Sequence, residues 1–294
     1  MTISRYSSTV TLQPTDKPYP SMLAFLIKRF PSVSCDIWER RILEGKVIDD
    51  RGNPIAIDSE YVPRNRIHYF REVEKERVIP FAEGILFQND DLLVSSKPHF
   101  LPVTPGGPYV AECLLNRLRR RTGNDDLVPI HRIDRETAGI VLFSANRKSR
   151  GLYSELFMHG KVEKTYRAVA ECNRIPERAE WMVENRMVKG EPWFRMAIAP
   201  GKANSRSIIK LVEAEEKCAR FILSPMTGKT HQLRLHMSGL GFRIVNDRYY
   251  PDLQPERDDD FANPLQLLAK TVRFHDPVTG EPMEFTSERE LQWW

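Results

Sequence analysis

The stretch PIHRIDRETAGIVLFSAN, residues 129–146, determines how the rest of the sequence is interpreted. It places Asp134 among His131, Arg132 and Arg135, directly before the apolar run of a predicted strand. Cations beside a carboxylate favour its ionised form, and an ionised carboxylate can act as a nucleophile or a general base. A structural cluster of ion pairs is the alternative. The stretch therefore predicts either an active-site carboxylate or a salt-bridged turn.

A second polar stretch, TGKTHQLRLHMSGLGFRIVNDRYY, spans residues 227–250. Thr230 is the predicted N-cap of a short helix that carries His231, Arg234 and His236. The interval between the two histidines suits a zinc-binding helix poorly, and the chain has no HExxH motif. We therefore expect no metal site here.

A third stretch, KTYRAVAE at residues 164–171, reads as a strand with Lys164 and Tyr166 on the same side. An aromatic ring beside a cation suits base stacking, although alternation of this kind occurs in any sheet. The charge of the chain is also uneven. Residues 113–150 hold nine basic and four acidic residues, or +5, whereas the whole chain carries +4. Such a local excess favours a phosphate backbone as partner, and a basic solvent-exposed helix is the alternative.

Changes in composition along the sequence predict three regions. Residues 1–20 read as a polar arm, residues 21–75 as a small basic module of two helices and a strand, and residues 81–294 as a larger domain. The charged segment 71–80 reads as a linker, and 251–263 as an acidic surface loop. Many short apolar runs and few helices predict an α+β domain on a mostly antiparallel mixed sheet. These predicted strands are Ile85–Phe87, Leu92–Ser95, Ile140–Ser144, Tyr166–Ala170, Ser207–Val212, Phe221–Leu223, Leu265–Leu268 and Met283–Phe285.

Composition excludes several classes of protein. The four cysteines of this 294-residue chain form no CxxC pair, so a zinc ribbon or dithiol site is not expected. The first twenty residues lack the apolar core of a secretory signal, and no apolar run approaches the length of a membrane span. Neither GxxxxGK[ST] nor GxGxxG is present, so no nucleotide cofactor is expected. We expect a cytoplasmic protein with no membrane partner, and among oligomeric states a monomer.

Four ordered motifs resemble those of the RluA-type pseudouridine synthases. They are HRIDRETAG at 131–139, KTY at 164–166, TGKTHQLRLH at 227–236 with a GxPIxGDxxY-like stretch at 241–249, and PLQLLAKTVRFHDPVTGEPMEF at 264–285. Departures from the family pattern occur at Ile133, Ala138, Lys229, Arg243 and Asn246, and none removes a catalytic group. The 21–75 module resembles, more loosely, the alpha-L RNA-binding motif that often precedes this catalytic domain.

The resemblance implies an RNA pseudouridine synthase that acts on rRNA or tRNA without a metal or cofactor. The enzyme breaks the uridine N-glycosidic bond, rotates the uracil and rejoins its carbon 5 to the ribose. Asp134 takes the role of the nucleophile, Arg234 of its cationic partner, and Tyr166 of the ring that stacks on uracil and helps move a proton. Arg132 takes the role of the side chain that fills the helix when the target nucleotide flips out. The residues predicted to bind RNA are Arg132, Arg135, His131, Lys164, Lys229 and His231, and for Lys164 and His131 a structural role is the alternative.

Two other functions account for part of the sequence. A non-catalytic RNA-binding or assembly protein could keep the basic stretch and the fold, but pure binding does not need the set Asp134, Tyr166 and Arg234. A hydrolase could use Asp134 on a sugar, but glycosidases normally pair two carboxylates, and Glu136 lacks motif support as the partner.

Overall fold

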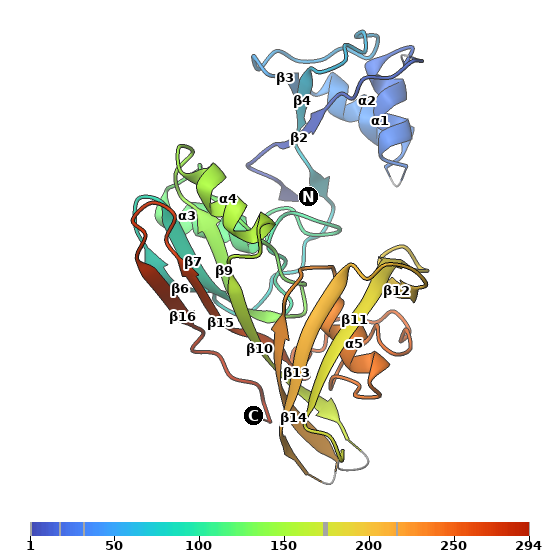
Figure 1. The fold of residues 1–294 in the computed structure, drawn as a ribbon. Coiled ribbons are helices and arrows are strands. Elements are labelled where there is room, and N and C mark those ends of the chain that lie inside the picture. Colours follow the sequence, from blue (N-terminus) through green and yellow to red (C-terminus); the bar gives the residue numbers. More distant parts are fainter. Residues whose placement is uncertain (1, 18, 32, 173–175, 216, 294) are drawn as a thin grey trace. The chain divides into compact units, whose positions relative to one another are not determined.

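The computed structural model describes residues 2–17, 19–31, 33–172, 176–215 and 217–293, and its ribbon is drawn in Figure 1. The chain folds into two compact units. The smaller unit comprises the chain up to Arg77 together with Gly106–Ala111, and the larger comprises Val78–Pro105 and the chain from Glu112 onward. The two units are described separately below.

The smaller unit packs two helices against a three-stranded antiparallel sheet of order β2-β4-β3. Its first helix begins where the Ser21 side chain accepts the Ala24 amide at 3.2 Å, an N-cap that satisfies a free donor. Leu26 and Trp38 are fully buried between helices and sheet. The elements are β1 (Thr2–Ile3), β2 (Ser8–Thr11), α1 (Met22–Arg29), α2 (Cys35–Leu43), β3 (Val47–Asp49), β4 (Arg66–Tyr69) and β5 (Glu72–Val73).

The structure differs from the sequence-based expectation at the start of the chain. The first twenty residues are no free arm, because β2 pairs with β4 and β1 with β5. The segment 71–80, predicted as a linker, contains the border between the two units, after Arg77, and also contains β5, where the Glu72 carboxylate is buried. Lys46 donates to that carboxylate at 2.6 Å. Within this segment Glu72 is therefore ion-paired and buried, whereas Glu74, Lys75 and Arg77 are exposed.

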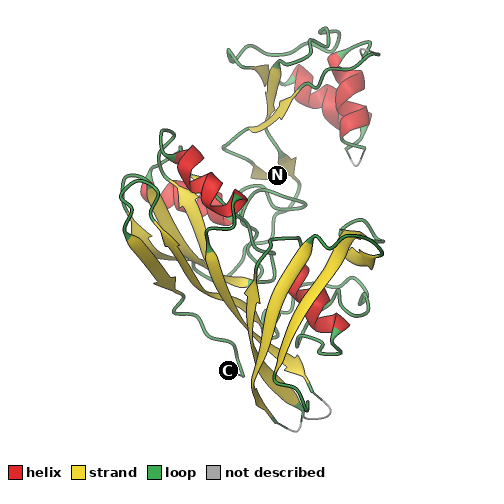
Figure 2. Cartoon of the chain, in the orientation of Figure 1, coloured by secondary structure: helices red, strands yellow, loops and turns green. Residues whose placement is uncertain are grey.

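The larger unit is built on one mixed sheet whose main path runs β12-β11-β13-β14-β10-β15-β9-β7-β6. Its pairings are antiparallel except for β9 with β15, so the prediction of an α+β domain on a mostly antiparallel mixed sheet is confirmed. Figure 2 shows the strands of this unit with its helices beside them. The strands are β6 (Gly84–Gln88), β7 (Leu92–Lys97), β8 (Val128–Pro129), β9 (Ala138–Ser144), β10 (Glu163–Glu171), β11 (Glu180–Lys189), β12 (Met196–Ala199), β13 (Ser205–Ala214), β14 (Cys218–Pro225), β15 (Leu267–His275) and β16 (Pro282–Thr286). The helices are α3 (Leu114–Thr122), α4 (Arg150–Met158) and α5 (Gln232–Gly239).

Two hydrophobic cores flank the middle of this sheet. One lies between α4 and strands β7, β9, β15 and β16, with Leu142 and Tyr153 buried in it. The other lies between α5 and strands β10, β13 and β14, with Phe221 and Met237 buried in it. The parallel pair β9–β15 joins the two halves, and the segment that carries Asp134 leads directly into β9. The fold thus brings the first quoted stretch beside α5, which carries the second.

Strand boundaries were predicted less well than strand positions. β15 was placed at Leu265–Leu268 but runs to His275, because its outer half alternates charged and apolar residues against β16. The segment 172–205 contains β11 and β12, for which the sequence pattern gave no prediction. Residues 173–175 of this segment lie outside the described residues. Of the predicted loop 251–263, no residue lies in a helix or strand.

Gly139 is required by the parallel junction of the sheet. Its φ of +116° lies in the region that side chains disfavour, and an added Cβ would lie 2.2 Å from the Ala269 carbonyl oxygen. We expect Gly139→Ala to lower the free energy of unfolding by about 3 kcal/mol or more. The control is Gly151→Ala, since Gly151 is helical with open space around its Cβ position. Urea midpoints of the two variants measure the difference, and equal midpoints would contradict this account of the junction.

Candidate active site

Asp134 lies in the loop between β8 and β9, and a buried lysine holds the main chain of that loop. The Thr137 amide donates to the Asp134 carbonyl at 3.2 Å and closes a turn. The Lys97 ammonium donates to the carbonyls of Pro98, Leu101 and Arg135 at 3.0, 2.7 and 2.9 Å. Burial lowers the pKa of Lys97 to about 7, although Glu136 and Asp134 oppose that shift. The backbone around Asp134 is therefore fixed from inside the domain.

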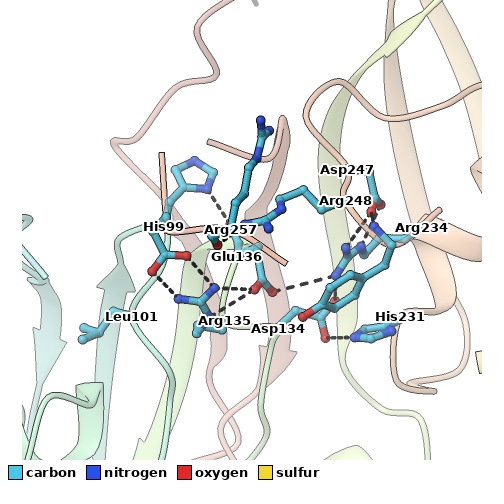
Figure 3. A network of polar contacts seen from close by, with 12 residues as sticks. His99, Leu101, Asp134, Arg135, Glu136, His231, Arg234, Asp247, Arg248 and Arg257 are labelled. Carbon is cyan, nitrogen blue, oxygen red and sulfur yellow. Dashed lines mark hydrogen bonds and ion pairs between the residues drawn. The ribbon is translucent and has the colours of Figure 1, made fainter. Parts of the chain in front are cut away.

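Arg234, on α5, is the cation at the centre of the site (Figure 3). Only 2% of its side chain is exposed, and its Nη1 lies 3.6 Å from Asp134 Oδ2 and 3.8 Å from Glu136 Oε2. Its Nε and Nη2 donate to the two carboxylate oxygens of Asp247 at 2.8 and 2.6 Å. Burial by itself lowers the pKa of Arg234, but Asp247 first, then Asp134 and Glu136, raise it above the usual value. One permanently charged guanidinium thus links three carboxylates.

Asp247 is a partner of Arg234 that the sequence did not predict. Its side chain is 1% exposed, and besides the two arginine bonds it accepts the amides of Tyr249 and Tyr250 at 2.8 and 3.1 Å. The guanidinium carbon of Arg234 also lies 4.7 Å from the centre of the Tyr249 ring. The sequence feature that could have identified Asp247 is the Gly-Asp pair of the family pattern. In this chain Asp247 retains the aspartate of that pair, and Asn246 replaces the glycine.

Tyr166 lies on β10 and is partly buried against the core that includes Leu223. Burial first, and Asp134 second, raise the pKa of this phenol well above its usual value. The hydroxyl therefore stays protonated at physiological pH and can donate a hydrogen bond.

His231 occupies the N-cap position of α5, one residue later than the predicted cap Thr230, with a left-handed φ of 53°. Its Nε2 lies 4.0 Å from Asp134 Oδ1, and its Nδ1 is 3.1 Å from the Tyr250 hydroxyl. Burial lowers the pKa of His231, with Asp134 opposing, so the ring is neutral near pH 7. His231 and Arg234 thus approach the same carboxylate from one helix end.

The other predicted residues lie in different surroundings. Arg132 and Lys229 are exposed. His131 stacks on Phe157 at 4.5 Å and accepts the Leu142 amide at 3.1 Å.

Burial lowers the pKa of His131 to about 3, and it also lowers the pKa of Lys164. The Arg135 guanidinium lies between Glu136 and Asp259. The structure therefore brings His231 and Arg234 to within 4.0 Å of Asp134, places Tyr166 on β10, and sets Arg132 and Lys229 outward.

Among the described residues, no group of three or more His, Cys, Asp or Glu side chains could hold a metal ion. Within the same part of the chain, no helix is both long and apolar enough to cross a membrane.

Comparison with known proteins gives the family. A model of the family described as RNA pseudouridylate synthase matches residues 91–239. The dual-specificity RNA pseudouridine synthase RluA of Haemophilus influenzae is 29% identical over 217 residues, covering 70% of this chain and 93% of its own. The tRNA pseudouridine synthase C of Haemophilus ducreyi is 30% identical over 227 residues, covering 71% and 92%. The ribosomal large subunit pseudouridine synthase C of Yersinia pestis is 29% identical over 291 residues, covering 91% and 88%.

A solved structure agrees at the level of the fold. Human RNA Pseudouridylate Synthase Domain Containing 1 superposes with a TM-score of 0.58 at 23% identity, covering 71% of this chain and 84% of its own. The fold and these relatives define the class: the chain belongs to the RNA pseudouridylate synthase family. Within that family it is of the RluA type, an enzyme that isomerises uridine in RNA.

Proposed function

We propose that this enzyme isomerises uridines of rRNA or tRNA with Asp134 as its nucleophile. The observation that carries the proposal is the exposure of the acids around Arg234. The Asp134 side chain is 21% exposed, compared with 17% for Glu136 and 1% for Asp247. Asp134 is thus the most open carboxylate of the three and the one best able to reach a bound nucleotide.

The reaction moves one glycosidic bond and one proton. The bond between uracil N1 and ribose C1′ breaks, the base rotates, a bond forms between C5 and C1′, C5 loses its proton and N1 gains one. Asp134 acts as nucleophile either on the sugar or on the base, and both routes need an ionised carboxylate. The Arg234 guanidinium, 3.6 Å away, balances that charge in a buried setting where the pair is held in place.

Arg132 acts when the target nucleotide leaves the helix, and Tyr166 acts on the uracil base in the site. A stacked uridine hides its glycosidic bond, so the nucleotide must flip out, at a cost of a few kcal/mol of lost stacking. Arg132 is exposed two residues before Asp134, where it can take the place of the flipped base. Tyr166, kept neutral, stacks on the uracil and relays the C5 proton.

The proposed RNA class follows the named relatives, which include enzymes of tRNA, of the large ribosomal subunit and of dual specificity. The basic stretch 113–150 supports RNA binding less than its charge indicates. Arg117 is ion-paired with Glu83 and Glu112, and Arg135 with Asp259. Arg120 and Arg121 lie 3.9 and 3.8 Å from the same two acids but remain about half exposed, so they are better candidates for phosphate contacts than Arg117. We further propose that the smaller unit is an alpha-L-like RNA-binding module.

Tritium release tests the function and sorts the substrates. The purified enzyme is incubated with rRNA and, separately, with tRNA labelled with tritium at uracil C5, beside Asp134→Asn. We expect the wild type to release tritium to water from at least one pool and the variant from neither. Release from neither pool, with RNA binding intact, would favour the non-catalytic binding protein.

A further inference from the structure

The acidic loop 251–263 is fastened to the domain at several points. The Arg248 side chain, which precedes the loop, donates to the carbonyls of Pro255 and Arg257, each at 3.1 Å. Near the end of the loop, the Phe261 ring packs 5.6 Å from Phe81 and 5.2 Å from Phe100, measured between ring centres. These contacts give the loop one defined path across the domain.

Asp259 is the acid that this path directs into the site. Asp259 lies in the acidic run Asp258–Asp260, yet only 9% of its side chain is exposed. Its carboxylate faces the end of the Arg135 guanidinium. Arg135 Nη1 and Nη2 donate to the two Asp259 oxygens at 2.7 and 2.8 Å. Such a parallel pair of charge-assisted bonds fixes both the position and the plane of a guanidinium.

Arg135 is therefore held at both its main chain and its side chain. Lys97 donates to its carbonyl at 2.9 Å, and its Nε donates to Glu136 Oε1 at 3.1 Å. Figure 3 shows Arg135 and Glu136 leading to Arg234, whose Nη1 lies between Glu136 and Asp134. Arg135 thus connects the acidic loop to Asp134, the residue immediately before Arg135 in the sequence and the proposed nucleophile.

We infer that Asp259 is a positioning residue for catalysis, which holds the Asp134 turn in its reactive geometry through Arg135. This inference rests on the proposed function of Asp134. Without Asp259, Arg135 loses its bidentate partner but keeps its bond to Glu136, so the guanidinium changes its plane and shifts Glu136 and the turn that carries Asp134. A shift of about 1 Å in a reacting group can cost about 100-fold in rate. The acidic loop then contributes to the rate of the chemical step as well as to the surface of the domain.

The test compares Asp259→Asn with Asp252→Asn, a control in the same loop with the same charge change at an exposed position. We expect Asp259→Asn to lower the single-turnover rate at saturating RNA by 10- to 100-fold, with the Kd for RNA within threefold of wild type. Asp259→Glu, which keeps the charge, regains most of the rate. The double variant R135Q/D259N is no slower than the slower single variant, since both remove one pair.

Melting temperatures show which variants are folded, and Asp259→Ser replaces Asp259→Asn if the latter is not. A folded Asp259 variant with the wild-type rate, or one that loses only RNA affinity, overturns the inference. The inference and the proposed function fail in different ways. If Asp134→Asn is inactive while Asp259→Asn is fully active, only the positioning role is lost. If Asp134→Asn is active, the nucleophile itself is wrong.

Discussion

Asp134→Asn is expected to lower the single-turnover rate of pseudouridine formation by about 10⁴-fold or more, because it removes the nucleophile while keeping the shape of the side chain. The fold should tolerate the change. The Asp134 side chain is 21% exposed, and its neighbours Arg234 and His231 lie at 3.6 and 4.0 Å, beyond hydrogen-bond distance. The melting temperature and the Kd for RNA are therefore expected to stay near the wild-type values.

The control for this variant is Asp252→Asn, which makes the same chemical change at an exposed loop position. It is expected to turn over at the wild-type rate. Rates are measured as tritium released from RNA labelled at uracil C5 with enzyme in excess, and affinities by filter binding. A residual rate above a few per cent in folded Asp134→Asn would contradict the assignment of the nucleophile.

The second large effect is expected from Arg234→Met, which should lose both activity and stability. Asp247, 1% exposed, loses two of its hydrogen bonds and becomes a buried charge without its cation. Removing one partner of a buried ion pair costs about 3–5 kcal/mol. Asp134 loses its balancing cation at the same time, so the rate is expected to fall by at least about 100-fold.

A double variant separates the two losses. In R234M/D247N the buried charge is gone, and the asparagine oxygen can still accept the amides of Tyr249 and Tyr250. Urea unfolding should show that part of the lost stability returns, while the single-turnover rate stays low. Recovery of the rate together with the stability would make Arg234 a purely structural residue and would contradict its catalytic role.

The sequence predicted the outline of the site because its residues lie in contiguous motifs. Asp134, Tyr166 and Arg234 each belong to a quoted motif, and the parallel junction at Gly139 lies at the end of the first. The core strands were found in the same way, since β7 and β9 are short apolar runs between turns. Local pattern was sufficient for these elements because their identity depends on neighbours in the chain.

What could not be predicted is which carboxylate each arginine contacts. Arg234 was paired with Asp134, yet its closest bonds go to Asp247, 13 residues further on. Arg135 was assigned to RNA, yet its guanidinium meets Asp259, 124 residues away. A motif gives the type of side chain but not which of several carboxylates reaches it, because that choice is made by the path of loops.

The measurement that tests the central claim most directly is a count of products from one reaction. Wild-type enzyme acts on RNA labelled at uracil C5, and tritium released, pseudouridine in digested RNA and free uracil are measured together. The account predicts one pseudouridine for each tritium released and no free uracil. Free uracil with abasic RNA would contradict it and indicate a hydrolase, and bound RNA with no tritium release would contradict it by showing that the site does not act on uridine.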